Sequence, residues 1–335
     1  MTDLEPISPR KAVEMYLEHR KHELSKKSIQ NHKYRLDTFV EFCEIEDIDD
    51  LNELTGRDLH AYRVWRGEDL TTLTLKSNLA TLRVFLEFCA TIDAVEQGMR
   101  EKVVLPDVDA EDESRSVQLE EDRAERILEF CEKFRYASRD HVIMAILWHT
   151  GIRIGTLRSM DVSDWDSEAL LLKVRHDPDS DTPLKNGTAA ERSIVVGEHY
   201  GEAIDDFIEY NREDTTDDAG RSPLITTRFG RIANATIRNT IYRLSRPCIV
   251  GRDCPHDRDE DECEALEPYQ GSQCPSSRSP HSVRRGAITR MLREGVPEEV
   301  VSDRSNATPD VLEQHYDERS ERERAERRRD FLDDA

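Results

Sequence analysis

The first hundred residues carry apolar side chains at the spacings of three and four that are typical of amphipathic helices. Between Ser8 and about Gly98, these positions include Val13, Tyr16, Leu17, Leu36, Phe39 and Cys43. Four helices fit the pattern, and polar residues that suit helix N-caps precede them: Ser8, Ser28, Thr55 and Thr72 or Thr74. The pattern predicts an all-helical unit over residues 1–102.

Residues 103–118 interrupt this pattern. The stretch VVLPDVDAEDESRSVQ is rich in acidic residues, contains a proline and has no period, so it predicts a linker. Residues 119–335 resume the helical pattern, first with the amphipathic LEEDRAERILEFCEKF and then with the nearly all-apolar RDHVIMAILWHTG. We expect the second of these helices to be buried at the centre of a second unit.

Two short runs in the second unit are typical of strands rather than helices. ALLLKVRHD and ERSIVVG are leucine-rich or β-branched, and they flank the turn-rich segment PDSDTPLKNGTAA. They predict a small antiparallel hairpin or part of a three-stranded sheet. Helical patterns then return in residues 198–212, 235–246, 282–295, 297–304 and 309–316. The predicted fold class is therefore mainly α, with a small antiparallel β-sheet in the second unit.

Composition changes the picture of possible partners. The 335 residues are enough for two cores without disulfides, but the formal net charge of −23 argues against a polyanionic partner. An acidic surface also keeps proteins soluble at very high salt, where screening acts over about 3 Å or less and only local basic contacts count. One local basic patch contains Lys26, Lys27, His32, Lys33 and Arg35, although these residues could also form a solvated helix face.

Nothing in the sequence predicts a membrane segment. No apolar run approaches the roughly 20 residues that span a bilayer. The start MTDLEPISPRKAVEMYL has neither a basic region nor an apolar core of the kind found in signal peptides. We therefore expect a cytoplasmic protein without a membrane partner.

Five residues that are far apart in the chain could surround one phosphate. Arg153 follows the predicted buried helix in a turn between two glycines, and Lys185 lies in the predicted hairpin turn. His281 and Arg284 are three residues apart, so they share one face of a helix. Tyr316 follows near the end of the last predicted helix. Taken singly, each arginine could form a structural ion pair, the histidine could cap a helix and the tyrosine could be a packing residue.

In this order, the residues resemble the tyrosine recombinase (phage integrase) family of site-specific DNA recombinases. That family's first box reads roughly Thr-Gly-x-Arg-x-x-Glu-Leu, here TGIRIGTL, and its second reads His-x-Leu-Arg, here HSVR. The chain looks similar to Xer-like enzymes and to integrases of halophilic archaea. The resemblance implies an N-terminal helical, SAM-like core-binding domain over residues 1–102. It also implies a catalytic domain over residues 119–335.

The resemblance assigns a role to each residue. Cleaving a phosphodiester without a metal needs a nucleophile, charge neutralisation and a proton for the leaving oxygen. By the resemblance, Tyr316 forms a 3′-phosphotyrosyl link while Arg153 and Arg284 clamp the phosphate. Lys185 is then the general acid, and His281 assists proton transfer and phosphate binding. Catalysis would need no cofactor. Lys173, in a predicted strand, is the rival of Lys185.

The sequence departs from the family pattern at two places. Thr156 stands where the first box usually has a glutamate. The family also has a His or Trp, following a glycine, about nine residues before the tyrosine, where this chain has Asn306 or Ala307. We expect Asn306 to support phosphate binding through its amide. His315, beside Tyr316, is an alternative for this supporting role.

A cysteine-rich insertion spans residues 248–274. Three of the seven cysteines lie at apolar helix positions, and the other four are in this insertion together with His256: Cys248, Cys254, Cys263 and Cys274. A loop of this length without a core is not expected to order itself. Because disulfides are disfavoured in a reducing cytoplasm, the four thiols favour a structural zinc site, with His256 as an alternative ligand. A redox-labile disulfide pair and unliganded thiols are the alternatives.

The sequence favours a DNA strand-exchange enzyme that acts on double-stranded DNA. By the resemblance, it would be a homo-tetramer on paired sites and a monomer or dimer off DNA. The charged tail DERSERERAERRRD would dock on a neighbouring subunit or form a frayed terminus. Two alternatives are a DNA-binding regulator of the same fold that has lost cleavage, and a type IB topoisomerase.

Overall fold

The computed structural model describes residues 4–107, 117–259 and 262–316. The chain divides into two compact units, Met1–Ser116 and Val117–Ala335. Most of the predicted linker and the charged C-terminal tail lie outside the described residues. Within the described part, no helix combines the length and apolar character needed to cross a bilayer.

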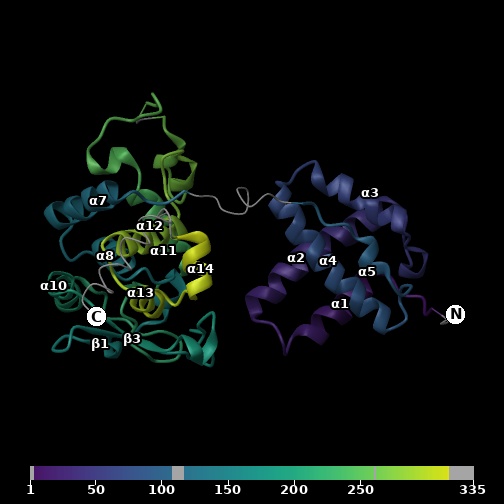
Figure 1. Ribbon diagram of the computed structural model, residues 1–335, viewed down its shortest axis with the longest axis horizontal. Helices are drawn as coiled ribbons and strands as arrows, with labels where there is room; N and C mark the ends of the chain where they lie inside the picture. The colour runs from purple at the N-terminus through teal and green to yellow at the C-terminus, as the bar shows by residue number, and fades with distance from the viewer. Residues whose placement is uncertain (1–3, 108–116, 260–261, 317–335) are drawn as a thin grey trace, which may run out of the picture. The chain divides into compact units, whose positions relative to one another are not determined.

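The first unit is a small helical bundle (Figure 1). Its helices are α1 (Pro9–Arg20), α2 (Lys26–Ile45), α3 (Gly56–Gly67), α4 (Thr72–Thr91) and α5 (Met99–Lys102). Edge-to-face aromatic contacts join α2 to α3 and α1 to α4, with ring centroids 5.3 Å apart between Phe39 and Tyr62 and 5.6 Å apart between Tyr16 and Phe85. These rings are almost completely buried. The predicted all-helical character of this part is confirmed.

Two of the four predicted caps are right and two are wrong. Ser8 caps α1, and Thr55 caps α3. The cap of α2 is Ser25, three residues before the predicted Ser28, and that of α4 is Thr71, which comes before both predicted residues, Thr72 and Thr74. In both cases the predicted residue, Ser28 or Thr74, donates its backbone N–H to the side chain of the true cap.

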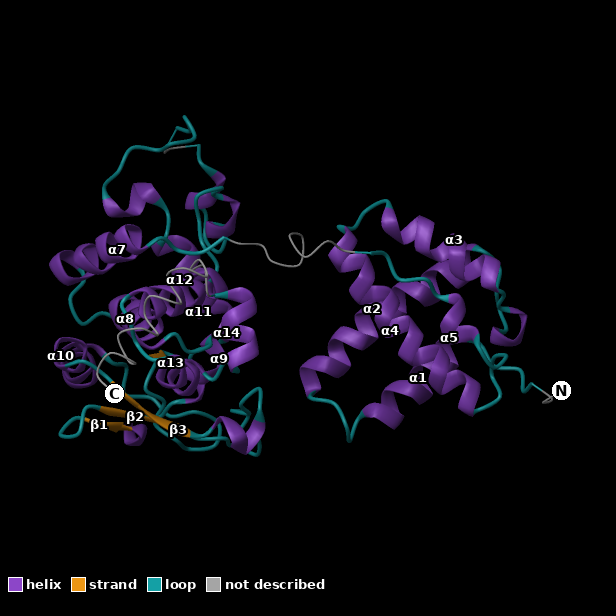
Figure 2. Cartoon of the chain, in the orientation of Figure 1, coloured by secondary structure: helices purple, strands orange, loops and turns teal. Residues whose placement is uncertain are grey.

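The second unit is mostly helical with small antiparallel sheets, which confirms the predicted fold class (Figure 2). Three short strands form one sheet in the order β1-β2-β3, and two form another. The strands are β1 (Trp165–Asp166), β2 (Leu171–Val174), β3 (Arg192–Val195), β4 (Thr226–Thr227) and β5 (Gly230–Arg231). The helices are α7 (Glu121–Phe134), α8 (Arg139–Thr150), α9 (Ile154–Ser159), α10 (Glu198–Asp206), α11 (Asn234–Leu244), α12 (Pro280–Arg293), α13 (Glu298–Ser305) and α14 (Pro309–His315).

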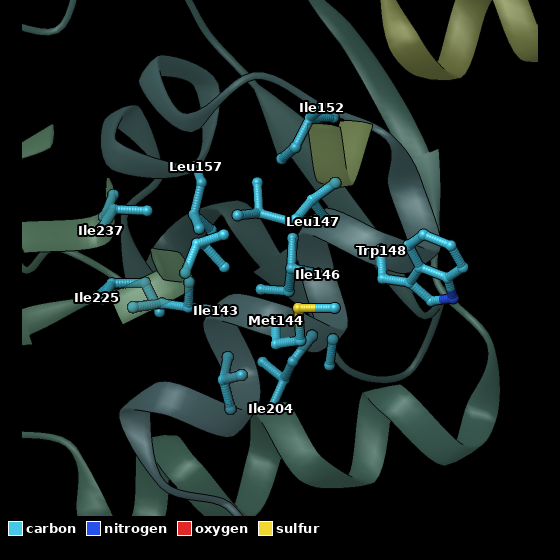
Figure 3. Packing of buried hydrophobic residues seen from close by; sticks show 14 of the residues in the cluster. Ile143, Met144, Ile146, Leu147, Trp148, Ile152, Leu157, Ile204, Ile225 and Ile237 are labelled. Carbon is cyan, nitrogen blue, oxygen red and sulfur yellow. The ribbon is translucent and has the colours of Figure 1, made fainter. Parts of the chain in front are cut away.

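Helix α8 is buried at the centre of this unit, as its apolar sequence predicts. Every residue from His141 to Trp148 is buried, because other helices and loops cover α8 on all sides. Figure 3 shows Ile143, Ile146 and Leu147 of this helix packed among side chains from other segments. This core fixes the turn after α8, in which Arg153 lies.

The predicted hairpin forms between β2 and β3. Leu172 pairs with Ile194 across the two strands, and both side chains are buried. The next pair, Lys173 and Ser193, is exposed. This alternation gives the hairpin one face on the core and one face in solvent. The connecting segment carries Lys185 in a turn.

Helix α12 approaches the segment before α7 very closely at Gly286. A methyl group built on this glycine would lie 2.1 Å from the carbonyl oxygen of Leu119 and 2.9 Å from the ring of Trp148. The backbone N–H of Leu119 also donates to the carbonyl of Ser282, at 2.9 Å. These contacts set the position of α12, which carries His281 and Arg284.

Candidate active site

Arg284 is the most deeply buried residue of the candidate site, with 3% of its surface exposed. Its Nη1 atom donates to the carbonyl oxygens of Gly151 and Ser305, both at 2.6 Å. Its Nη2 atom is buried and has no acceptor of good geometry in the described part of the chain. Burial lowers the pKa of Arg284, the charge of Arg153 lowers it further, and Tyr316 opposes both effects. The site therefore holds a desolvated cation with one donor atom unused.

Arg153 brings a second guanidinium to the same place. It is the N-cap residue of α9, directly after the turn at Gly151, whose φ of 65° ends α8 in a left-handed conformation. Its Nη1 atom donates to the carbonyl oxygen of Asn306 at 3.0 Å. Two neighbouring guanidinium groups of this kind favour a bound anion, and their planar forks suit a phosphate.

Tyr316 closes the site from α14. Its side chain is 5% exposed and packs in a cluster with Ile288, Met291 and Leu312. The phenol also acts on the nearby Arg284 guanidinium by favouring its charged form. Tyr316 is thus a packed aromatic residue, as its surroundings in the sequence suggest, and its polar end is also directed to the arginine pair.

The C-terminal end of α13 organises the two arginines. Successive backbone carbonyls, those of Ser305 and Asn306, accept hydrogen bonds from Arg284 and Arg153, respectively. The carbonyls at a helix C-terminus lack partners within the helix and carry partial negative charge, so they attract cations. The end of α13 therefore holds both guanidinium groups in place.

Asn306 and Ala307 occupy the place where the family has a glycine followed by His or Trp. Asn306 has a φ of 52°, a left-handed conformation that glycine adopts most easily. Its side-chain oxygen accepts from Asn186 at 3.3 Å. Ala307, nine residues before Tyr316, is buried. The structure thus brings the Asn306 backbone to Arg153, and a contact from its amide to phosphate stays a prediction.

The two other predicted residues are exposed. Lys185 lies in the turn between β2 and β3, one residue from Asn186, which reaches the end of α13. His281 lies in the first turn of α12, one turn before Arg284. The rival Lys173 points from the exposed face of β2 to Asp166, with 3.5 Å between nitrogen and oxygen. The structure brings together Arg153, Arg284, Tyr316 and the Asn306 backbone, with Lys185 and His281 on adjoining segments.

The segment that carries Lys185 is anchored just before the turn. The backbone N–H of Leu184 donates to the His176 ring at 3.0 Å, and the Leu184 side chain is buried. Arg158 of α9 binds Asp181 through its carboxylate at 3.0 Å and through its carbonyl at 2.6 Å. These contacts hold a polar loop against the core and leave the lysine exposed.

The described residues do not bring the predicted zinc ligands together, and zinc binding stays a prediction. None of the four cysteines in the insertion is in a disulfide. In residues 4–107, 117–259 and 262–316, no group of three or more His, Cys, Asp or Glu side chains is arranged to hold a metal. The alternative ligand His256 instead contacts the Ser276 hydroxyl at 2.8 Å.

The insertion packs against α11 and the residue Arg246 that follows it. Three short 3₁₀ turns break it up: Pro247–Val250, Glu264–Leu266 and Gly271–Gln273. The buried Arg246 donates to the carbonyl of Ala265. Gly271 lies so close to α11 that a methyl group built on it would be 3.2 Å from the Arg243 backbone nitrogen. The sequence reasoning overlooked this small packed interface.

Comparison with known proteins agrees with this geometry. A family model described as "Phage integrase family" matches residues 118–318, and one described as "Phage integrase, N-terminal SAM-like domain" matches residues 13–91. The chain belongs to the phage integrase family. The predicted resemblance is therefore confirmed. The second match includes α1 to α4, so the SAM-like domain of this integrase family member is its first helical unit.

Individual relatives are distant or partial. Tyrosine recombinase XerC of Bacillus pumilus is 25% identical over 187 residues, which cover 55% of this chain and 57% of the relative. The N-terminal domain of a phage integrase/site-specific recombinase from Haloarcula marismortui is 41% identical. It covers 30% of this chain and 99% of that one, with a TM-score of 0.30.

Solved structures of two other integrases share the fold. The Tn1549 transposon integrase in complex with circular intermediate DNA has a TM-score of 0.66 at 16% identity, and the match covers 96% of this chain and 99% of that one. A lambda integrase dimer bound to a core site has a TM-score of 0.67 at 13% identity, over 95% of this chain and 79% of that one. At these identities, the likeness concerns the fold.

Proposed function

We propose that this integrase family member is a site-specific DNA recombinase that cleaves and rejoins strands through a 3′-phosphotyrosyl intermediate. The observation that carries the proposal is the buried Arg284 beside Arg153, with the Tyr316 phenol acting on Arg284. The buried Arg284 guanidinium and the partly buried Arg153 guanidinium neutralise the non-bridging oxygens of a phosphodiester, and they do so most strongly as charge develops in the transition state. The phenol is next to that position.

The reaction needs no cofactor. The Tyr316 oxygen attacks phosphorus while the bond to the 5′-oxygen breaks, and Lys185 donates a proton to that leaving oxygen. His281, in the first turn of α12, assists proton transfer and phosphate binding. A 5′-hydroxyl from another strand then attacks the phosphotyrosyl bond and releases the tyrosine. The energy of the phosphodiester is retained, so rejoining needs no external energy source.

The partner is double-stranded DNA in the cytoplasm, and the assembly is a homo-tetramer on paired sites and a monomer or dimer off DNA. The local basic patch on α2 is smaller than its sequence suggests. Lys33 pairs with Asp37 at 2.6 Å, and Arg35 donates to Thr81 at 2.9 Å. Lys26 and Lys27 are exposed at the start of α2 and are free to approach the DNA backbone.

The test uses a pool of nicked duplexes with a randomised central sequence, because the target site is not known. The protein is incubated with the pool in high salt, and DNA that stays attached in detergent is recovered and sequenced. We expect enrichment of one site, and mass spectrometry should find the nucleotide on the peptide that contains Tyr316.

The outcomes separate the proposal from its alternatives. A protein that binds one duplex sequence and forms no adduct would be a regulator without cleavage activity. Adducts on unrelated sequences, together with relaxation of supercoiled plasmid, would instead indicate a topoisomerase. Either result would contradict the proposal.

Lys185→Ala should reduce the cleavage rate about 10²- to 10⁴-fold, the range expected for the loss of a general acid. The loss should largely disappear on a duplex whose scissile 5′-oxygen is replaced by sulfur, because a thiol with a pKa near 8.5 leaves without a proton. Single-turnover rates on the two duplexes measure the effect. Lys173→Ala is the matched control, and the same rescue in this variant would assign the acid to Lys173 instead.

A further inference from the structure

Arg192, at the start of β3, donates hydrogen bonds to backbone carbonyls from all three of its guanidinium nitrogens. Its Nε and Nη2 atoms both donate to the carbonyl oxygen of Arg304, at 3.1 Å and 2.9 Å. Its Nη1 atom donates to the carbonyl of Ala190 at 2.7 Å. A guanidinium that binds one oxygen through two nitrogens has a fixed direction, which the single ammonium of a lysine cannot reproduce.

The oxygen that Arg192 binds belongs to the same helix end as the arginine pair. The next two carbonyls along the chain, those of Ser305 and Asn306, accept from Arg284 and Arg153. Three guanidinium groups from three separate segments therefore bind three consecutive carbonyls at the end of α13. The sequence reasoning did not identify Arg192.

The charge environment of Arg192 agrees with this placement. Burial lowers the pKa of Arg192 to about 10, Asp303 opposes this shift, and Arg284 and Arg153 add to it. Arg192 thus stays protonated at neutral pH, within electrostatic reach of both arginines of the candidate site.

Arg192 also stands at the base of the hairpin that carries Lys185. It pairs with Val174 across β2 and β3, and Lys185 lies in the segment between these strands. Asn186, next to the lysine, donates to the Asn306 side chain at 3.3 Å. The hairpin is therefore attached to the end of α13 both at its base and beside the lysine.

We propose that Arg192 is a positioning residue for Lys185. By fixing the hairpin to the end of α13, Arg192 sets the place of the lysine relative to a phosphate clamped by Arg153 and Arg284. This inference rests on the strand-cleavage function proposed above. Arg192 itself need not touch DNA, because its three bonding nitrogens already bind protein carbonyls.

The test compares Arg192→Gln and Arg192→Lys with wild type on the nicked duplex selected from the pool. The duplex is made with either oxygen or sulfur at the scissile 5′ position. On the oxygen duplex we expect a cleavage rate about 10- to 100-fold lower for Arg192→Gln, a smaller loss for Arg192→Lys, and unchanged half-saturation by DNA. On the sulfur duplex, which needs no general acid, both variants should be within about threefold of wild type.

Arg175→Gln is the matched control. Arg175 follows β2 in the same hairpin, but its side chain is 59% exposed and pairs with Asp164 instead of α13. For Arg175→Gln, we expect the ratio of the cleavage rate on the oxygen duplex to that on the sulfur duplex to be close to the wild-type ratio. An equal loss on both duplexes for Arg192→Gln, or no loss on either, would overturn the positioning role.

A measurement without DNA separates this inference from the proposed function. Hydrogen exchange of the amides in residues 183–191 should be faster in Arg192→Gln than in wild type, while the midpoint of thermal unfolding changes little. Unchanged exchange in this segment would overturn the inference even if cleavage is impaired. Absence of an adduct with wild-type protein would overturn the proposed function, and the exchange result would still decide whether Arg192 anchors the hairpin.

Discussion

Replacing Tyr316 with phenylalanine is expected to abolish the covalent adduct with DNA and to reduce strand cleavage by more than about 10⁴-fold. The variant loses the attacking oxygen but keeps the ring that packs with Ile288, Met291 and Leu312. Because only a hydroxyl is removed, the free energy of unfolding should change by no more than about 1 kcal/mol. Denaturing gels measure the adduct, and thermal unfolding measures the stability.

Tyr210→Phe is the control for this substitution. Tyr210 is 70% exposed and lies in the second unit, beyond α10. The Tyr210→Phe variant should form the covalent adduct with DNA at the wild-type rate. If Tyr316→Phe still became attached to DNA, another residue would be the nucleophile, and the assignment of α14 as the nucleophile helix would be wrong.

Gly286→Ala is expected to destabilise the second unit by about 3 kcal/mol or more. The added methyl group would lie 2.1 Å from the carbonyl oxygen of Leu119, which is backbone and cannot rotate away. Helix α12 must therefore shift, and it carries both Arg284 and His281. For a unit of this size, the midpoint of thermal unfolding should fall by roughly 6 to 12 °C.

Gly155→Ala makes the same chemical change where there is room. Gly155 lies inside α9, and nothing is within 4 Å of a methyl group built on it. Alanine is favoured over glycine inside helices by about 1 kcal/mol, so this variant should be as stable as wild type or slightly more stable. A similar loss in both variants would mean that helix packing at Gly286 is looser than the contact distances indicate.

The elements that local pattern controls could be predicted from the sequence. The central position of α8 follows from a run in which nearly every side chain is apolar, and the hairpin follows from two short β-branched or leucine-rich runs. The caps at Ser8 and Thr55 were also predictable, whereas the caps of α2 and α4 are Ser25 and Thr71 instead of Ser28 and Thr72 or Thr74. A helix cap and the residue three positions after it are often both polar, as are Ser25 and Ser28. Sequence alone therefore does not decide whose side chain accepts the hydrogen bond from a backbone N–H at the start of the helix.

The contacts that assemble the site could be predicted only in part. Arg153, Arg284 and Tyr316 were found because their residue types and order suit one phosphate. The partners of the two arginines are backbone carbonyls as far as 153 positions away, and any residue type can supply these acceptors. For the same reason, nothing in the sequence marks Arg192, whose acceptor is the carbonyl of Arg304.

The packing of the insertion could not be predicted for a related reason, and zinc binding stays a prediction. The zinc prediction assumes that a segment with few apolar residues has no other means of becoming ordered. The structure instead uses one buried arginine and one close glycine, Arg246 and Gly271, which hold the insertion against α11. Neither residue stands out by type or spacing among its polar neighbours.

The carbonyl contacts at the end of α13 bear on how this site can evolve. Because the arginines bind backbone oxygens, most changes of side chain at residues 304 and 305 leave these acceptors in place. In a set of homologous sequences, residues 304 and 305 should therefore vary more than the three arginines that bind the end of α13, with residue 305 kept small because Ser305 is buried. The range of residue types at position 306 should be narrower, with glycine and asparagine most frequent, because its φ of 52° disfavours β-branched residues.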